Sequence, residues 1–192
     1  MKRLSFIAAL FVIIAFNFGC HNGHTGENCI DNNPYFEPEP LPESGTLACS
    51  FYTNSKISID EDTTQNLTVA YIQEGSNTVF RYYYNDHWEA TGSVGEYDTL
   101  PPPPADAFET AVVFEVPSNK EEFLLSGNDL KRANAMYGNI CNCSAYGYLP
   151  ITSGCIKGIK INDSEWQIDI NILAEKDDVV FSKMISDRFI TP

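Results

Sequence analysis

The chain has 192 residues, of which 26 are acidic and 12 are lysine or arginine, so its formal net charge is −14 at pH 7. A surface this acidic repels phosphate backbones, and no cluster of basic residues offsets it, so nucleic acid is not expected as a partner. Hydrophobic residues make up 43% of the chain and charged residues 20%. This composition supports a packed core, and one globular domain is expected.

The first segment has the features of an export signal. Lys2 and Arg3 precede an apolar run, residues 4–18, that is interrupted by two polar residues. The run is shorter than the roughly 20 residues that span a bilayer as a helix, and it suits the hydrophobic region of a signal peptide. Residues 1–19 are therefore predicted to be a signal peptide that is removed on export.

The pair Gly19-Cys20 resembles the end of a bacterial lipoprotein signal, in which the cysteine receives a lipid and becomes the first mature residue. Asn17 and Phe18 depart from the family pattern, which has an aliphatic and a small residue there. The resemblance implies that Cys20 is the lipidation site and that acyl chains anchor the protein to the membrane. Because His21 is not the aspartate linked with inner-membrane retention, it also implies the outer membrane. Plain secretion and an uncleaved anchor are the alternatives.

Residues 20–44 are predicted to form a spacer between the membrane and a folded domain. The segment contains four prolines and five acidic residues, and it has no lysine or arginine. Few apolar residues and repeated prolines favour an extended, solvated chain. His21, His24 and Cys29 have metal-binding side chains, but a polar linker is the preferred interpretation because no fourth ligand is visible. No metal and no cofactor are expected.

Residues 45–192 are predicted to form a single domain rich in β-strands. β-branched and aromatic residues concentrate in the segments 67–72, 78–84, 108–116 and 156–161. Residues of these types favour strands. With strands at short spacing and little helix, an antiparallel β-sandwich with one short helix is the expected fold, and a small β-barrel is the alternative.

The clearest local pattern lies near the C-terminus. Apolar residues alternate with polar ones from Trp166 to Ile172, directly after the turn-forming cluster 162–164. A period of two after a turn predicts a hairpin with one buried face. Residues 175–178 are expected to turn the chain into a last strand that begins at Val179.

One short helix is expected after Asn128, which can cap it. Its body would run from Leu130 to Tyr137, and Gly138 would supply the left-handed end. Residues 99–104 contain four consecutive prolines. They are expected in an exposed loop, because proline cannot donate to a strand ladder.

The chain has six cysteines. If Cys20 carries lipid, the remaining disulfide candidates are Cys29, Cys49, Cys141, Cys143 and Cys155. Their odd number leaves at least one thiol free or in an intermolecular bond. Disulfides are permitted in an exported protein, and the plausible pairs join Cys155 to the Cys141-Cys143 cluster and Cys29 to Cys49. Free thiols and metal binding are the alternatives, although the spacing matches no common zinc module.

No catalytic motif stands out. A Ser-His-Asp arrangement would need His87, and no nucleophile elbow accompanies it. Asp60, Asp62 and Thr64 place oxygen ligands at alternate positions, as calcium sites often do. The glycine and the distal glutamate of an EF-hand are missing, so a solvated acidic turn is expected there.

Aromatic residues concentrate around a single predicted strand. If this segment is a strand, Arg81 and Tyr83 share one face, and the residues on the opposite face are Phe80, Tyr82 and Tyr84. If Tyr83 and Trp88 are exposed near loops, they form with His87 a candidate stacking platform for sugar rings or a partner protein. Core and rim positions are the alternative.

The sequence therefore predicts a membrane-anchored lipoprotein whose β-rich domain has a non-enzymatic binding or structural role on the cell envelope. A glycan or a protein is the expected type of partner. The alternative is a small envelope hydrolase or carbohydrate-active protein that uses carboxylates and the aromatic group.

Overall fold

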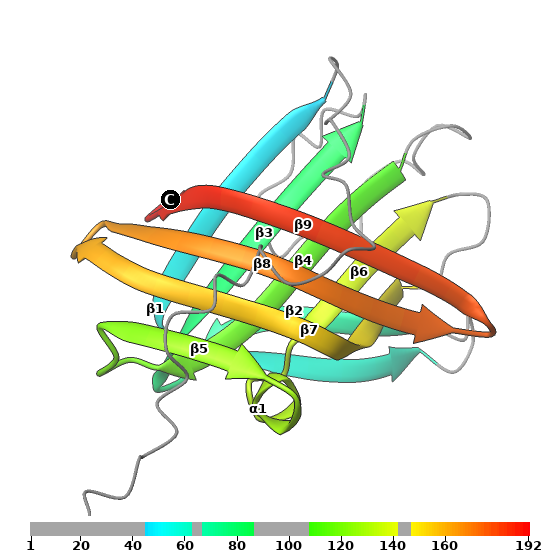
Figure 1. Ribbon diagram of the computed structural model, residues 1–192, viewed down its shortest axis with the longest axis horizontal. Helices are drawn as coiled ribbons and strands as arrows, with labels where there is room; N and C mark the ends of the chain where they lie inside the picture. Colours follow the sequence, from blue (N-terminus) through cyan, green and yellow to red (C-terminus); the bar gives the residue numbers. More distant parts are fainter. Residues whose placement is uncertain (1–44, 63–66, 87–107, 142–146) are drawn as a thin grey trace, which may run out of the picture.

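The computed structural model describes part of the chain, namely residues 45–62, 67–86, 108–141 and 147–192. These residues form a mostly β fold with one short helix, which confirms the predicted fold class (Figure 1). The signal peptide, the lipidation site Cys20, the spacer 20–44 and the proline segment 99–104 lie outside the described residues and stay predictions.

Nine strands form one sheet in the described part of the chain. In chain order they are β1 (Thr46–Asp62), β2 (Leu67–Glu74), β3 (Asn77–Asp86), β4 (Phe108–Pro117), β5 (Glu122–Ser126), β6 (Met136–Cys141), β7 (Gly147–Asn162), β8 (Glu165–Lys176) and β9 (Val179–Ile190). The helix α1 (Asn128–Arg132) lies between β5 and β6 in the chain. Long ladders are antiparallel, and two single-residue parallel contacts, Ser50 with Ile190 and Thr68 with Gly147, do not close the sheet into a regular barrel.

Two long strands change register, and each therefore belongs to two layers. β1 shifts between Tyr52 and Ser55, so that its first half pairs with β3 and its second half with β2. β7 shifts between Ile151 and Ser153, so that it pairs first with β6 and then with β5 and β8. Such irregularities bend a strand.

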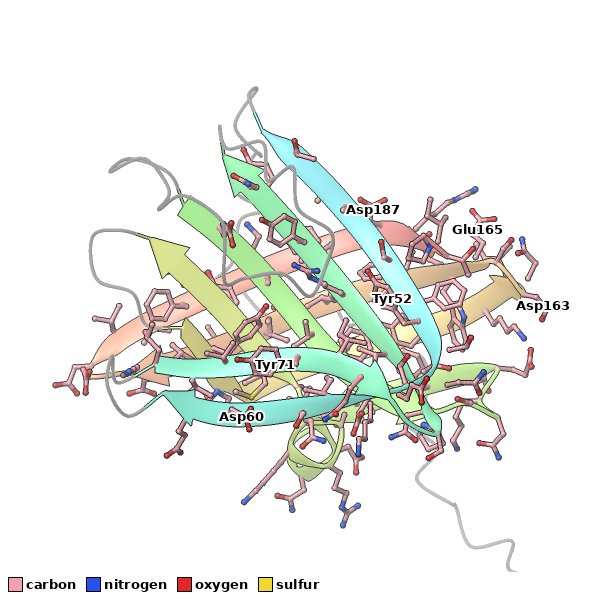
Figure 2. The ribbon with its side chains drawn as sticks, turned by 180° about the vertical axis from the view of Figure 1, so that it is seen from behind. Tyr52, Asp60, Tyr71, Asp163, Glu165 and Asp187 are labelled. Carbon is pink, nitrogen blue, oxygen red and sulfur yellow. The ribbon has the colours of Figure 1, made fainter. Side chains whose placement is uncertain are left out.

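The bends divide the sheet into three layers (Figures 1 and 2). The middle layer consists of the first half of β1 with β3, β4 and β6. The front layer consists of β5, β7, β8 and β9 and faces the viewer in Figure 1. The hairpin layer, formed by the second half of β1 and by β2, crosses the opposite side of the middle layer and is in front in Figure 2.

The main core lies between the middle and front layers. Trp166, Ile168 and Ile170 of β8 point into it and alternate with more accessible residues, as the period of two predicts. Phe80 is fully buried at its centre. Its ring centroid lies within 6.1 Å of those of Phe51, Phe114, Phe123, Trp166 and Phe189.

A second core lies between the middle layer and the hairpin layer. Val79, Ala111 and Val113 are buried there with Ile57, and Ile72 packs against them. The middle layer is therefore covered on both sides. For this reason, β3 and β4 have long runs of β-forming residues in place of a simple alternation.

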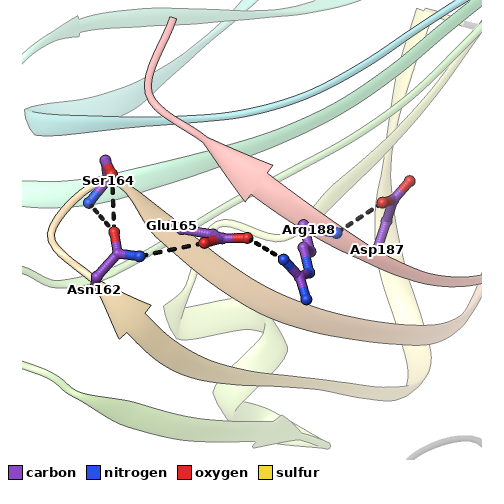
Figure 3. Close-up of polar contacts among 5 residues, drawn as sticks. All are labelled: Asn162, Ser164, Glu165, Asp187 and Arg188. Carbon is purple, nitrogen blue, oxygen red and sulfur yellow. Dashed lines mark hydrogen bonds and ion pairs between the residues drawn. The ribbon is translucent and has the colours of Figure 1, made fainter.

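The predicted C-terminal hairpin is confirmed. β7 ends at Asn162, and the side-chain oxygen of this residue accepts hydrogen bonds from the amide and the hydroxyl of Ser164, each at 2.8 Å (Figure 3). This local contact is typical of an asparagine turn. At the other side of the turn, Glu165 accepts a hydrogen bond from Arg188 of β9 at 2.8 Å. The last strand begins at Val179, as predicted.

The predicted helix is too long and its cap is wrong. α1 ends at Arg132, while Met136 and Tyr137 begin β6, which pairs with β4 and β7. Met136 is buried in the second core and Tyr137 in the main core, so burial outweighs the helix propensity of this segment. The cap position is occupied by Gly127 and not by Asn128, and no side chain caps the helix.

The predicted acidic turn is corrected in part: its first residues continue a strand and are exposed as expected, while Thr64 lies outside the described residues. Asp60 and Glu61 lie in β1, where they are exposed and pair with Val69 and Thr68 of β2. Within the described residues, no three histidine, cysteine or acidic side chains gather into a metal site. The described part of the chain also has no helix long and apolar enough to cross a membrane.

Candidate functional site

Tyr83 is not the exposed platform that the sequence suggested. It lies on β3, on the side of the middle layer that faces the hairpin layer, and it packs half-buried against the second core. The guanidinium carbon of Arg81 lies 4.5 Å from the centre of its ring. Arg81 and Tyr83 thus share one face of the strand, as the alternation predicted, and the arginine covers one face of the tyrosine ring.

Tyr83 instead belongs to a group of polar side chains that we call the loop-end cluster, which consists of Arg81, Tyr83, Asn85 and Glu109. Asn85 pairs directly with Glu109 across β3 and β4, and Tyr83 lies two residues from Asn85 on the same face. The side-chain nitrogen of Asn85 donates a hydrogen bond to the Tyr83 hydroxyl at 3.4 Å. The Tyr83 hydroxyl also hydrogen-bonds Glu109.

Burial raises the pKa of the Glu109 carboxyl above its ordinary value of 4.5. The hydrogen bond with Tyr83 and the positive charge of Arg81 both act to lower this pKa, but together they do not offset the loss of water. Glu109 is therefore a partly dehydrated carboxyl held by fixed neighbours. Binding groups and general acids both have this character.

The loop-end cluster lies at the edge of the middle layer where several connections meet. The chain leaves β3 and enters β4 at this edge. β6 ends and β7 begins there as well, because Asn139 pairs with Gly147. His87 and Trp88 directly follow β3 in the sequence but lie outside the described residues, so their part in the site stays a prediction.

A second group of titratable side chains lies near the contact between β1 and β9. The Cys49 thiol donates a hydrogen bond to a carboxylate oxygen of Asp187 at 3.5 Å. Burial, followed by the negative charge and the hydrogen bond of Asp187, raises the pKa of Cys49 to about 12. Burial also raises the pKa of the neighbouring Tyr82. A thiol that stays protonated is a poor nucleophile, so this group is not arranged for cysteine catalysis.

The structure changes the predicted cysteine pairings. Cys49 is a free thiol, so the pairing of Cys29 with Cys49 is wrong. Cys155 is half-buried on β7 and is disulfide-bonded. Cys29, Cys143 and the side chain of Cys141 lie outside the described residues, so the pairing of Cys155 with the Cys141-Cys143 cluster stays a prediction.

Two further surface features were not predicted. An apolar strip on the outer face of the front layer consists of Leu124, Ile159 and Ile161, which are 40%, 44% and 48% exposed. An open groove of about 780 Å³ runs between the hairpin layer and α1, where Ile59 and Lys131 are part of its lining. Neither feature has a sequence signature, because both depend on which strands lie side by side.

Comparisons of the chain with protein-family models, with curated proteins and with solved structures find no match in any of the three. The loop-end cluster, with its mutually fixed polar groups and its raised carboxyl pKa, is therefore the candidate site on which function is argued.

Proposed function

We propose that the protein is a lipid-anchored binding protein of the cell envelope, whose β domain recognises a hydroxyl-rich ligand such as a glycan at the loop-end cluster. The observation that carries this proposal is the arrangement of Glu109, Tyr83 and Arg81 on one face of the middle layer. They place a carboxyl, a phenol and a guanidinium at one edge of the sheet, and the buried Asn85 holds the phenol by a hydrogen bond.

These groups suit the hydroxyls of a sugar. The carboxyl oxygens accept hydrogen bonds from hydroxyls, and the guanidinium nitrogens donate to them. The cluster stands on strands whose two faces are both covered, so little conformational freedom is lost when a ligand binds. In this proposal Trp88, three residues after Asn85, supplies the stacking surface that Tyr83 does not.

The lipid anchor in this proposal rests on the Gly19-Cys20 pair and on the apolar run that precedes it. Acyl chains on Cys20 would hold the protein at the membrane, because each buried methylene contributes about 0.8 kcal/mol. Replacement of Cys20 by alanine should move the protein from the membrane fraction to the soluble fraction. Unchanged partitioning would contradict the anchor and leave the binding site to be judged separately.

The binding site is tested with a panel of oligosaccharides that includes chitotetraose, maltohexaose and mannotetraose. Glu109→Gln keeps the shape of the side chain and removes its charge. Loss of a hydrogen bond to a charged group costs about 1.5–3 kcal/mol, so binding should weaken by roughly 10- to 100-fold. Glu122→Gln, at an exposed position on β5, is the matched control and should bind like the parent. If the parent binds no member of the panel, the glycan proposal fails.

The raised pKa of Glu109 also favours a second candidate function, a carbohydrate-active hydrolase with Glu109 as general acid. The same oligosaccharides distinguish the two. Release of new reducing ends that is abolished by Glu109→Gln would support the hydrolase. Binding without release supports the binding protein.

A further inference from the structure

The second half of β1 has a free edge. Residues 56–62 pair with β2 on one side, and among the described residues no strand pairs with them on the other side. This free edge faces α1, because β1, marked by Asp60, lies between α1 and β2, marked by Tyr71 (Figure 2). An unpaired strand edge offers backbone donors and acceptors to another strand.

Two hydrogen bonds show which backbone groups lie on this edge. The carbonyl of Asn54 accepts a hydrogen bond from the amide of Gly75, so the even-numbered residues of this part of β1 direct their backbone groups toward β2. The odd-numbered residues direct theirs away from β2, and the Ile57 amide accordingly donates to Glu115. The amide and the carbonyl of Ile59 therefore lie on the free edge, two residues beyond the one that Glu115 occupies.

The groove between the hairpin layer and α1 lies beside this edge. Its volume of about 780 Å³ falls within the roughly 300–1,000 Å³ that is typical of ligand sites. The lining includes the exposed Ile59 of β1, Lys131 of α1, and the buried side chains of Met136 and Ile151. The groove thus combines an apolar surface, one cation and an adjacent strand edge.

We propose that an extended peptide of a partner protein adds to the free edge of β1 as an antiparallel strand, with an apolar residue opposite Ile59 and a basic residue opposite Glu61. Ile59 and Glu61 lie on one face of β1, so the two peptide side chains that oppose them also share a face. Glu61 is exposed, and a residue of opposite charge across a strand pair is favourable. The added strand would receive two hydrogen bonds from and to the backbone of Ile59.

Lys131 suits the outer side of such a strand. Carbonyl groups on the outer edge of the peptide would face α1, and the ammonium of Lys131 can donate hydrogen bonds to them. Glu115 limits the strand at the other end, because its carboxylate already accepts the hydrogen bond of the Ile57 amide. The peptide therefore extends from Ile59 toward Glu61.

The charges on β1 disfavour a second copy of this chain as the added strand. An antiparallel copy with Ile59 opposite Glu61 would place Asp60 opposite Asp60, and a copy centred on Glu61 would place two glutamates opposite each other. Like charges directly across a strand pair are destabilising. A copy centred on Ile59 would need the backbone of Ile57, whose amide is already bonded to Glu115. A partner with a basic residue avoids these conflicts.

This site is separate from the loop-end cluster and does not rest on the function proposed for that cluster. Glu115 lies six residues along β4 from Glu109, which is about 20 Å in a strand. A glycan at one site and a peptide at the other would let the protein hold an envelope protein beside an envelope glycan.

The proposal is tested with the peptide Ac-Ser-Thr-Lys-Thr-Val-Thr-Ser-amide, which places valine opposite Ile59 and lysine opposite Glu61. The peptide is titrated into the isotope-labelled mature chain with Cys20→Ala and followed by nuclear magnetic resonance. Shift changes should be largest at Ile59 and Glu61, and hydrogen exchange of the Ile59 amide should slow in the complex. Absence of binding, or larger shifts at the loop-end cluster, would overturn the proposal.

A matched peptide tests the backbone pairing. N-methylation of the valine keeps every side chain but removes the amide that donates to the Ile59 carbonyl. This peptide should bind roughly tenfold or more weakly. Equal binding of the two peptides would show that the groove holds side chains alone and would overturn strand addition. Slow exchange of the Ile59 amide without peptide, increasing with protein concentration, would identify a second copy as the occupant and overturn the proposal as well.

Variants of β1 test the edge and the register. Ile59→Pro removes the edge amide, while Ile59 and Ala70 form a pair without hydrogen bonds between them, so the ladder with β2 is preserved and binding should be lost. Glu61→Lys should weaken binding by about 2- to 5-fold and should favour a peptide in which glutamate replaces lysine. Asp60→Lys, on the opposite face of β1, is the matched control and should have a smaller effect. Equal effects of the two lysine variants would contradict the proposed register.

Discussion

The carboxylate of Glu115 accepts a hydrogen bond from the backbone amide of Ile57 at 2.8 Å and thereby joins the middle layer to the hairpin layer. Its second oxygen accepts a hydrogen bond from the side chain of Asn134 at 2.8 Å. Glu115 is 8% exposed, so these contacts lie in a largely dry environment. One buried carboxylate thus connects β4, β1 and the segment that follows α1.

Replacement of Glu115 by alanine should destabilise the protein substantially. The amide of Ile57 and the side chain of Asn134 would lose their acceptor, and one buried unsatisfied group costs about 1–3 kcal/mol. The free energy of unfolding, measured with urea, should fall by at least this amount. Glu122→Ala, at an exposed position, is the control and should change it by about 0.5 kcal/mol or less. Equal effects of the two variants would show that the Glu115 contacts contribute little.

Gly158 should not tolerate a side chain. A Cβ at this position on β7 would collide with the ring of Phe123 and press against the Ile168 side chain. Gly158→Ala should therefore cost about 1–3 kcal/mol of unfolding free energy. Adding Phe123→Leu removes the ring and should recover part of that cost, so the two substitutions would be non-additive in a double-mutant cycle. If the effects of the two substitutions on the unfolding free energy simply add, the cost of Gly158→Ala does not come from the contact with Phe123.

The titration of Glu109 should appear in the pH dependence of stability. Its pKa in the folded protein is raised above the ordinary value of 4.5 that the unfolded chain retains. Between these two pKa values the folded state binds more protons than the unfolded state. The contribution of Glu109 to stability is therefore fully present below about pH 4.5, and it is lost as the pH rises through the folded-state pKa. Urea unfolding at a series of pH values should give a smaller loss in this window for Glu109→Gln than for the parent. Parallel curves would refute a raised pKa.

The Cys49 thiol should react slowly with alkylating reagents in the folded protein. Burial and Asp187 raise its pKa to about 12, so it is protonated at neutral pH. Asp187→Asn removes the negative charge and should accelerate alkylation, although burial, the larger cause, would keep the pKa above that of an unfolded thiol. Mass spectrometry of the Cys49 peptide against time measures both rates. Equal rates in the two proteins would contradict this account of the shift.

The order of apolar and polar residues predicted those strands that have one buried face and one accessible face. The alternation from Trp166 to Ile172 defines β8, because one buried face and one accessible face produce a period of two. Both faces of β3 and β4 are covered, so these strands show no such alternation, and they were predicted from their high content of β-forming residues. The first strand was not predicted. Tyr52 to Ser55 look like a turn in sequence, but Asn54 adopts a φ of 52° at an irregularity within β1.

Long-range pairing explains most of what the sequence did not predict. Alternation placed Arg81 and Tyr83 on one face, but the approach of Glu109 follows from its register opposite Asn85, across a connection of more than twenty residues. The residue types around Met136 favour a helix. Met136 lies in a strand instead because it is buried in the second core, under the hairpin layer, and this burial cannot be read from the local sequence. The pairing of Cys29 with Cys49 was wrong for a similar reason, since sequence separation does not show that the Cys49 thiol is buried beside Asp187.

The central claim, that the loop-end cluster binds a glycan, is tested most directly by a nuclear magnetic resonance titration of the isotope-labelled mature chain with Cys20→Ala, using the tightest oligosaccharide of the panel. The largest shift changes should occur at Arg81, Tyr83, Asn85 and Glu109, and Glu109→Gln should reduce them at the same ligand concentration. Absence of shifts in the cluster, or larger shifts at the apolar strip than at the cluster, would contradict the claim.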